Sequence, residues 1–372
     1  MAKKRLDYID GFKGLMCFMI MLGHFWNIYR GTSGASPLDH WFLDRITKMP
    51  GNSWILVASF WLYAFLIISG YLISFSRVQD VWDLLIRSVS RFLRLFIPIL
   101  GACLIIYVIG ETVGFHANET KEFFKSKWFQ KYYRRDYEFA DVFTQSMKAM
   151  FSGSCSFNSP FWVIRDMLVS SVLIYICKLV DQIFQRKTHL LPLAILLVAL
   201  YLDNQVIMAC FVGFLIGYYA DAISKLTDKI WPFLLVSCLV YGVFRWLRAE
   251  KVLPKVFDKV MGYTLVHCFV LIALNRFSFL QRIFTTKPFL LAGKISFGVY
   301  AFHWPVICSV GSLVLIAGIR ENWHPVSTIG ASFAVSVAVT VVLSVIYLFT
   351  VEMFGDKVVG WVRKLGTRGK EK

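Results

Sequence analysis

Long runs of apolar residues, separated by short polar segments, recur along the whole chain. Most of them approach the length of about 20 residues that an α-helix needs to cross a bilayer. The pattern predicts an all-α fold, a polytopic membrane helical bundle of about ten transmembrane helices, built as one membrane domain over residues 1–372. The runs lie at 13–29, 54–75, 96–114, 160–181, 189–203, 205–221, 231–247, 260–275, 289–315 and 329–350.

The composition agrees with a membrane chain. Of the 372 residues, 57% are hydrophobic and only 17% are charged, whereas a soluble domain averages about 45–50% and about 25%. These values exclude an ordinary soluble globule, a disordered chain and a small disulfide scaffold. The eight cysteines are scattered, form no Cys-x-x-Cys pair and lie mostly in apolar runs. That distribution is typical of small core residues and not of a zinc site or a disulfide framework.

The charge balance is strongly basic, with 40 Lys and Arg residues against 23 Asp and Glu residues and a net charge of +17. In a membrane chain, basic residues keep loops on the cytoplasmic side and contact anionic headgroups. We therefore expect membrane lipids as partners, and no nucleic acid. Basic residues at both ends, including a tail at 355–372, predict a multi-pass protein of the cell (plasma or inner) membrane with both termini in the cytoplasm.

Two segments that this topology places outside the cell are nevertheless basic. Residues 115–159 contain the stretch from Lys121 to Arg135, but acidic residues balance it and its length suffices for an extracytoplasmic cap. The segment 245–259 has no such explanation and violates the positive-inside rule. A cleaved signal peptide could explain the first run, but such a peptide has no reason to hold Lys13 and His24.

Three ionisable residues share one face of the first predicted helix. Lys13 and His24 are eleven residues apart, which is almost three helical turns and ~16 Å along the axis. Asp10 lies one turn below Lys13, near the cytoplasmic headgroups, while His24 reaches into the bilayer, where an ionisable group is a candidate functional residue. Two structural alternatives stay open: a neutral His24 bonded between helices, and a Lys13–Asp10 pair at the interface.

A basic helix follows the second run. Arg87, Arg91 and Arg94 stand at i, i+4 and i+7, so one helix face carries three guanidinium groups and the opposite face is apolar. This predicts an amphipathic helix on the inner membrane surface. This helix either anchors to lipid or binds phosphate, because a guanidinium group can donate two parallel hydrogen bonds to phosphate oxygens. In the run before it, Ser69-Gly70 permits close helix packing or the approach of a ligand to the backbone.

Polar residues also interrupt the later runs. Arg165 and Asp166 follow Trp162 near the expected outer leaflet, where they form either a neutralised structural pair or part of a pocket for a polar acceptor. Tyr300 and His303 share a face of the ninth run, which adds a second intramembrane histidine. The chain contains no Walker, GxGxxG, GxSxG or HExxH motif, and its seven histidines lack metal-ligand spacing, so no metal site is predicted.

Taken in order, these residues resemble acyltransferase family 3, membrane proteins that O-acylate cell-surface carbohydrates and related acceptors. The opening Ile9-Asp10-Gly11-Phe12-Lys13-Gly14, with His24, is similar to the family's opening pattern. Lys13 stands where arginine is commoner, and lysine acts as a point charge and not as a bidentate donor. The other similar segments are Ser69–Ile73, Arg87–Pro98, Phe161–Asp166, Ile295–Pro305 and Val351-Glu352.

The resemblance implies acetyl-CoA or another acyl-CoA as a cytoplasmic co-substrate, a carbohydrate or glycolipid acceptor and no permanently bound cofactor. His24 would act as general base or carry the acyl group briefly, and Asp10 would orient or neutralise Lys13. The expected donor-binding residues are Lys13, Ser69, Arg87, Arg91 and Arg94. The expected acceptor-binding residues are Trp162, Arg165, Asp166, Tyr300 and His303. A membrane transporter and a non-catalytic partner in polysaccharide export remain as alternatives.

Overall fold

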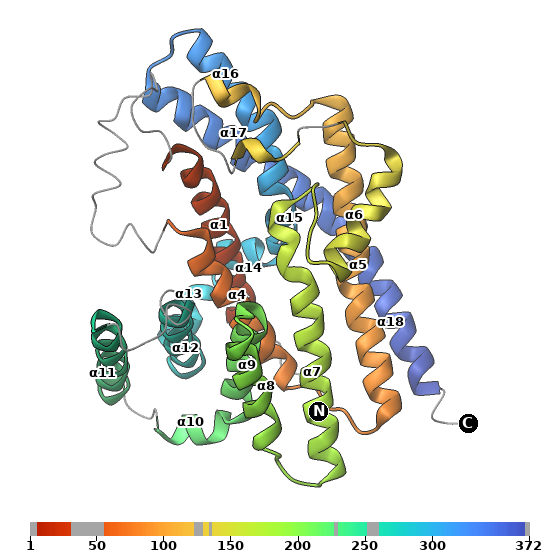
Figure 1. Cartoon of the computed structure of the whole chain (residues 1–372), viewed down its shortest axis with the longest axis vertical. Helices are drawn as coiled ribbons and strands as arrows, with labels where there is room; N and C mark the ends of the chain where they lie inside the picture. The colour runs from red at the N-terminus through yellow and green to blue at the C-terminus, as the bar shows by residue number, and fades with distance from the viewer. Residues whose placement is uncertain are drawn as a thin grey trace.

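A computed structural model of the protein shows an all-helical bundle (Figure 1). It describes residues 6–30, 56–122, 129–133, 136–226, 230–250 and 260–368. Within these ranges every regular element is a helix or a helical turn. The helices that build the site are α1 (Asp7–Arg30), α4 (Ala58–Ser74), α5 (Val81–Thr112), α7 (Ile164–Ile183), α14 (Lys287–Lys294), α15 (Ser296–Val306), α17 (Pro325–Tyr347) and α18 (Met353–Arg368).

The remaining elements surround these helices or link them. Between α5 and α7 lie η1 (Glu119–Glu122), η2 (Phe129–Lys131), α6 (Phe139–Phe151) and η3 (Ser159–Val163), which we call the cap elements. Between α7 and α14 the chain forms α8 (Leu190–Tyr201), α9 (Gln205–Tyr218), α10 (Ala220–Leu226), α11 (Ile230–Ala249), α12 (Val260–Arg276) and α13 (Ser278–Phe284). The π-helical turns η5 (Ile307–Gly311) and η6 (Leu348–Glu352) flank α16 (Ser312–Arg320) and α17.

A helix lies at each of the ten predicted runs, but few of these helices are long and apolar enough to cross a membrane alone. Among the described residues, three qualify: Val81–Thr112, Ser296–Arg320 and Pro325–Gly366. A fourth candidate is the pair Gly262–Arg276 and Ser278–Phe284, which is bent by 95°. The prediction of ten membrane spans is therefore not confirmed, whereas the all-α fold class is.

Two element boundaries differ from the sequence prediction. The basic helix of Arg87, Arg91 and Arg94 is not a separate surface helix, because α5 runs unbroken for 32 residues through Pro98. The packing of α18 along α5 stabilises this long helix, and Tyr347 Oη donates to the carbonyl oxygen of Pro98. The predicted run 289–315 is interrupted, since α14 ends at Lys294 before α15 begins.

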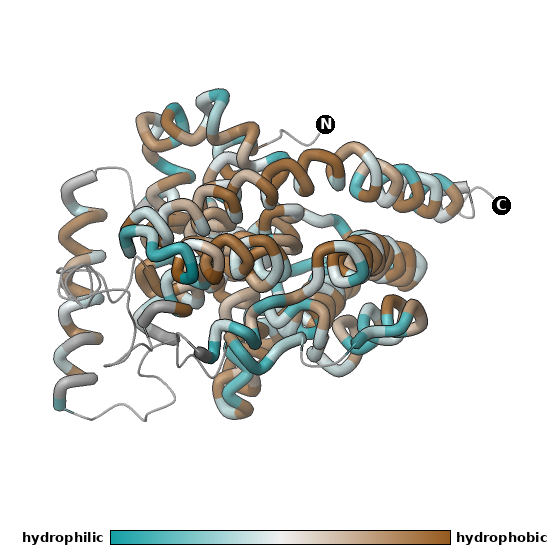
Figure 2. Tube along the Cα trace, turned by 90° about the horizontal axis from the view of Figure 1, so that it is seen from above, coloured by the Kyte–Doolittle hydropathy of each residue, from teal (hydrophilic) through white to brown (hydrophobic). Residues whose placement is uncertain are grey.

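The bundle's outer surface is apolar, as a lipid-facing surface must be. Figure 2 shows brown, hydrophobic stretches along the helices at the rim of the bundle, and α11 stands at its edge beside α12. Leu235, Leu239 and Val243 of α11 are 62%, 58% and 55% exposed. In a soluble protein such a surface would mark an interaction site, and here it agrees with membrane-embedded helices.

Small residues bring the helices of the core together. At Gly14 and Gly293 the backbones of α1 and α14 meet, and a Cβ atom at Gly293 would overlap the carbonyl oxygen of Asp10. On α17, buried hydroxyl residues recur at every fourth position, which forms a narrow stripe against α15 and η5. They are Thr328, Ser332, Ser336, Thr340 and Ser344. Stripes of small residues permit close approach of membrane helices.

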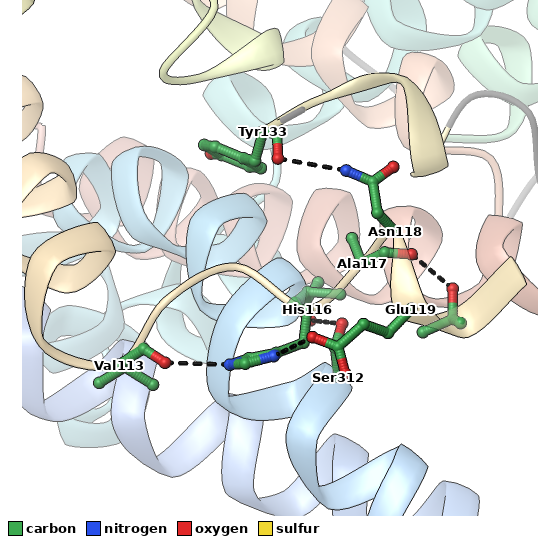
Figure 3. A network of polar contacts seen from close by, with 9 residues as sticks. Val113, His116, Ala117, Asn118, Glu119, Tyr133 and Ser312 are labelled. Carbon is green, nitrogen blue, oxygen red and sulfur yellow. Dashed lines mark hydrogen bonds and ion pairs between the residues drawn. The ribbon is translucent and has the colours of Figure 1, made fainter. Parts of the chain in front are cut away.

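The cap elements attach to the helix that carries His303. A π-helical turn leaves a main-chain carbonyl available for another partner, and in η5 the carbonyl oxygen of Cys308 accepts from His116 N at 2.8 Å and Ala117 N at 3.2 Å. Figure 3 shows the segment around His116, where the Asn118 side chain points to the carbonyl of Tyr133. The cap is thereby linked to α15 through η5.

Several sequence-based expectations concern residues outside the described ranges. These are the basic residues before Leu6, the basic stretches within 123–128 and 134–135, most of the segment 245–259, and the last tail residues from 369. The expected cap at 115–159 corresponds to the described cap elements, while its extracytoplasmic location stays a prediction.

Replacing Gly70 tests the close packing of α4 on α9. A Cβ atom at Gly70 would overlap the carbonyl oxygen of Cys210, so Gly70→Ala must push the two backbones apart. We expect the free energy of unfolding to fall by about 1–3 kcal/mol, measured as a lower thermal midpoint of the detergent-solubilised protein. The matched control is Gly330→Ala on α17, where a Cβ meets nothing within 4 Å. Equal midpoints for the two variants would contradict this account of the packing.

Candidate active site

A cavity of about 640 Å³ opens among α1, α4, α5, α7, α14, α15 and α18, and we call it the basic cavity. Seven acidic or basic residues line it: Asp10, Lys13, Arg91, Arg94, Lys294, Glu352 and Asp356. Apolar residues, among them Leu62, Phe65 and Ile68, form much of the rest of the wall. The cavity therefore combines a cluster of cations with an apolar lining.

Lys13 and Asp10 form the ion pair that their spacing on α1 predicts. Lys13 Nζ lies 2.6 Å from Asp10 Oδ1, and the two side chains are 23% and 25% exposed. Both line the basic cavity. The carboxylate holds the ammonium group at the cavity wall, where the close contact of α1 with α14 fixes their backbone.

Arg91 is the most firmly held cation of the basic cavity. Its Nε donates to Ser171 Oγ at 3.0 Å, and its Nη2 donates to Ser69 Oγ at 3.2 Å. Of the two alternatives for Ser69-Gly70, the structure confirms close helix packing, while the approach of a ligand to the backbone stays a prediction. Gly70 permits the packing of α4 on α9, whereas Ser69 faces the cavity and orients a guanidinium group.

The other two arginines of α5 differ in position. Arg94 lines the basic cavity and lies 3.4 Å from Asp356 on α18. Arg87 lies one turn before Arg91 and is not among the residues that line the cavity. The structure thus brings together four of the five predicted donor-binding residues, and leaves Arg87 apart.

Three charged residues of the basic cavity were not predicted as site residues: Lys294, Glu352 and Asp356. Glu352 ends the π-helical turn η6, and its Oε1 is buried without a hydrogen-bond partner among the described residues. A carboxylate directly after an apolar run, in the Val351-Glu352 element, was the signal that could have identified it. That Glu352 reaches this cavity follows only from the tertiary structure, in which α18, directly after Glu352, packs along α5.

His24 and His303 form a direct side-chain pair between α1 and α15. His24 Nδ1 lies 2.8 Å from His303 Nε2, and the two rings stack with centroids 5.0 Å apart. His303 is fully buried and His24 is partly buried. The indole of Trp304 packs edge-on against His24, with centroids 5.9 Å apart. The two histidines that sequence analysis identified independently thus belong to one unit.

The hydrogen bonds of this pair assign its tautomers. His303 Nδ1 lies 2.8 Å from the carbonyl oxygen of Val299, so Nδ1 carries the proton and donates. In a neutral His303, Nε2 then accepts, and the shared proton resides on His24 Nδ1. A neutral His24 consequently bears its lone pair on Nε2. The arrangement fixes the ring of His24 with its Nε2 as the basic atom.

Tyr300 separates the histidine pair from the basic cavity. It lines the cavity, and its ring centroid lies 6.2 Å from that of His303. Its hydroxyl donates to the carbonyl oxygen of Pro160 in η3. Nearby in the chain, Asn158 Nδ2 donates to the carbonyl oxygen of Ala301 at 2.7 Å. Neither histidine lines the cavity itself. Tyr300 therefore lies on the cavity wall, one ring contact from His303.

The predicted acceptor-binding residues do not form one cluster. Arg165 Nε contacts Asp166 Oδ1 at 2.8 Å, so these neighbours neutralise each other. Trp162 is 44% exposed and lines a second hollow beneath the cap elements. Tyr300 belongs to the basic cavity, and His303 pairs with His24.

A sequence model of an acyltransferase domain, that of acyltransferase family 3, matches residues 6–345, nearly the whole chain. The chain belongs to this acyltransferase family. Comparison with curated proteins and comparison with solved structures gave no match. Membership in the family, together with helices that can cross a bilayer, makes the protein a membrane acyltransferase and agrees with O-acyl transfer.

The matched range includes the histidine pair and most of the basic cavity, from Asp10 to Tyr300. Acyl transfer needs a base within reach of the attacking hydroxyl. His24 Nε2, oriented through His303, carries a lone pair of the kind that such a base requires.

Two replacements of His303 test its role in positioning His24. In His303→Gln the amide oxygen can still accept from His24 Nδ1, whereas His303→Leu leaves that proton without an acceptor. We expect His303→Leu to lower the acyl-transfer rate by about 10²–10⁴-fold, and His303→Gln to retain substantially more activity. The rates are measured on purified variants whose thermal midpoints equal that of the wild type. Equal losses in both variants would contradict positioning through this hydrogen bond.

Proposed function

We propose that the protein transfers an acyl group, most simply acetyl, from cytoplasmic acyl-CoA to a hydroxyl of a cell-surface or exported carbohydrate. The observation that carries the proposal is the succession of the basic cavity, Tyr300 and the histidine pair along α1 and α15. CoA has the matching shape, because its phosphates lie at one end and its thioester at the tip of a long, thin arm.

The cations of the basic cavity are the proposed phosphate site. Lys13, Arg91 and Arg94 reach it from two helices, and Lys294 adds a fourth positive charge. Charge-assisted hydrogen bonds to phosphate are among the strongest in proteins, and Arg91 is already oriented by its two serine partners. Arg87 is left out of this proposal, because it does not line the cavity.

The apolar wall of the cavity is proposed to hold the arm of the donor. Phe65 and Ile68 lie on this wall, and Tyr300 lies at its histidine end. The distance from Lys13 to His24 along α1 is ~16 Å by helix geometry. The buried Oε1 of Glu352 offers an acceptor for an amide N–H of the arm. For the thioester to reach His24, the Tyr300 side chain must turn aside.

His24 is proposed to act as the general base. Its Nε2 takes the proton of the acceptor hydroxyl as the hydroxyl oxygen attacks the thioester carbon. The new C–O bond forms, the C–S bond breaks, and the departing thiolate takes the proton from the His24 imidazolium. Attack of the same Nε2 on the thioester carbon would instead break the C–S bond, release the CoA thiolate and give a transient acyl-histidine. The acceptor hydroxyl oxygen would then take the acyl group from Nε2, and its proton would pass to the thiolate. Both routes need the lone pair that the hydrogen bond to His303 places on Nε2.

The orientation in the membrane follows from the same scheme. Acyl-CoA is a cytoplasmic metabolite, so the basic cavity would face the cytoplasm, together with both termini. The positive-inside rule places basic residues on that side. The cap elements would then face outward, where a surface carbohydrate is available.

Exchange of Lys13 tests the phosphate site. Lys13→Ala removes one cation of the basic cavity, so the KM for acetyl-CoA should rise roughly 10- to 100-fold with little change in kcat. With acetyl-pantetheine, which has no nucleotide phosphates, the variant and the wild type should have similar KM values. Lys287→Ala, an exposed lysine of α14 that does not line the cavity, is the control. An equal effect of Lys13→Ala on both donors would contradict the phosphate assignment.

Radiolabelled acetyl-CoA distinguishes the enzyme from a transporter or a non-catalytic export partner. Permeabilised cells with the wild-type protein should incorporate the label into surface glycan, and purified protein should consume acetyl-CoA slowly by hydrolysis. His24→Ala should lower both rates by about 10²-fold or more while it still binds acetyl-CoA. Unchanged turnover in His24→Ala would overturn the catalytic role, and an acetyl-CoA pool left intact by the wild-type protein would overturn the proposed function.

A further inference from the structure

A second hollow of about 480 Å³ lies beneath the cap elements, and we call it the cap cleft. Among the residues that line it are Lys131, Tyr132, Gln145, Lys148, Ser159 and Trp162. They come from η2, α6 and η3 and the residues beside them. The cleft shares no lining residue with the basic cavity.

The short helix η3 separates the two hollows. Ser159 and Trp162 line the cap cleft, whereas Val163, at the end of the same helix, lines the basic cavity. Tyr300 donates to Pro160 of η3, which ties this partition to α15. The basic cavity and the cap cleft are therefore separate chambers on either side of one helical turn.

The cap cleft lies close to the histidine pair. Tyr132, which lines the cleft, packs edge-on against Trp304 with centroids 5.8 Å apart. Trp304 in turn contacts His24 at 5.9 Å. Tyr300, on the basic cavity, contacts His303 at 6.2 Å. The histidine pair is thus within two ring contacts of both chambers, as a site that joins two substrates requires.

The charges of the cap cleft favour an anion. Lys131 and Lys148 line it, both are exposed, and no carboxylate residue lines it. Neither ammonium group forms an ion pair with a carboxylate in the part of the chain that the structure describes. Two uncompensated cations in a concave site raise the local concentration of anions and form charge-assisted hydrogen bonds with them.

The other groups of the cap cleft suit a polyhydroxylated ring. Gln145 is buried and its Oε1 accepts from Ser156 N at 2.9 Å, which leaves its NH₂ group as a donor. The hydroxyl of Tyr132 accepts from Ser159 Oγ at 2.7 Å and can donate outward. The exposed indole of Trp162 gives a flat apolar surface for the C–H face of a sugar. Such a set of few polar groups beside an aromatic plane is typical of specific ligand sites.

We propose that the cap cleft is the acceptor site and that it takes an acidic saccharide, whose carboxylate or phosphate lies between Lys131 and Lys148. The identification as an acceptor site rests on the proposed function, while the binding of an acidic saccharide does not. A hydroxyl of the bound sugar is then presented to His24 from the side opposite the donor, past Trp304.

Equilibrium binding to the full-length protein in zwitterionic lipid nanodiscs tests this proposal. The probes are trigalacturonic acid and maltotriose, which have the same number of rings and differ in charge, and glucose 1-phosphate for the phosphate form. We expect at least one of the two acidic probes to bind roughly tenfold or more tightly than maltotriose at low salt, with a preference that shrinks as salt rises. Lys131→Gln with Lys148→Gln should abolish that preference.

Two controls accompany this test. Lys121→Gln changes an exposed lysine of η1 that does not line the cleft, and should keep the preference. Trp162→Leu should weaken the binding of the acidic and the neutral probes alike, because stacking on the indole does not depend on the charge of the sugar. Unchanged acetyl-CoA binding by the double lysine variant shows that it is folded and that the donor site is separate.

The outcomes distinguish this inference from the proposed function. Acetyl-CoA binding and turnover without any preference for an acidic probe would overturn the acidic-saccharide site and leave the proposed function standing. Lysine-dependent binding of an acidic probe without acetyl-CoA turnover would overturn the proposed function and leave the acidic-saccharide site standing. If, in matched nanodiscs that contain anionic phosphatidylglycerol, this lipid displaced the acidic saccharides in a lysine-dependent manner, the cleft would be a lipid site and the proposal would be wrong.

Discussion

The hydrogen bond between His24 Nδ1 and His303 Nε2 is the interaction on which the candidate site depends. It joins α1 to α15 across 279 residues of sequence at 2.8 Å. It also decides the chemistry, because the bond from His303 Nδ1 to Val299 O fixes every proton of the pair and leaves the basic lone pair on His24 Nε2. A shift of either helix by one turn of about 5.4 Å would separate the rings and remove this base.

Close packing around the two helices holds this register. Gly14 of α1 meets the backbone of α14, and Gly298 of α15 meets Ser344 on the small-residue stripe of α17. The π-helical turn η5 then ties α15 to the cap through Cys308 O. Because a membrane interior offers no hydrophobic driving force between helices, such close contacts and buried hydrogen bonds carry the precision of the site.

The sequence predicted the parts of the site that lie on one helix. Helical periodicity put Asp10, Lys13 and His24 on one face of α1, and the ion pair of Lys13 with Asp10 follows from it. The same rule grouped Arg87 with Arg91 and Arg94, but it cannot tell where a cavity ends along α5. The partners of His24, Arg91 and Trp162 come from distant segments, so only tertiary packing reveals them. Apolar length alone also predicted more membrane spans than the helices support.

The account places one substrate on each side of the histidine pair, with the donor's phosphates among the cations of the basic cavity. An experimental electron-microscopy map of the His24→Ala protein in nanodiscs with acetyl-CoA tests this most directly. The account predicts phosphate density beside Lys13, Arg91 and Arg94, and the acetyl group at the vacated position of the His24 ring. Density for the nucleotide elsewhere, or a thioester pointing away from α15, would contradict it.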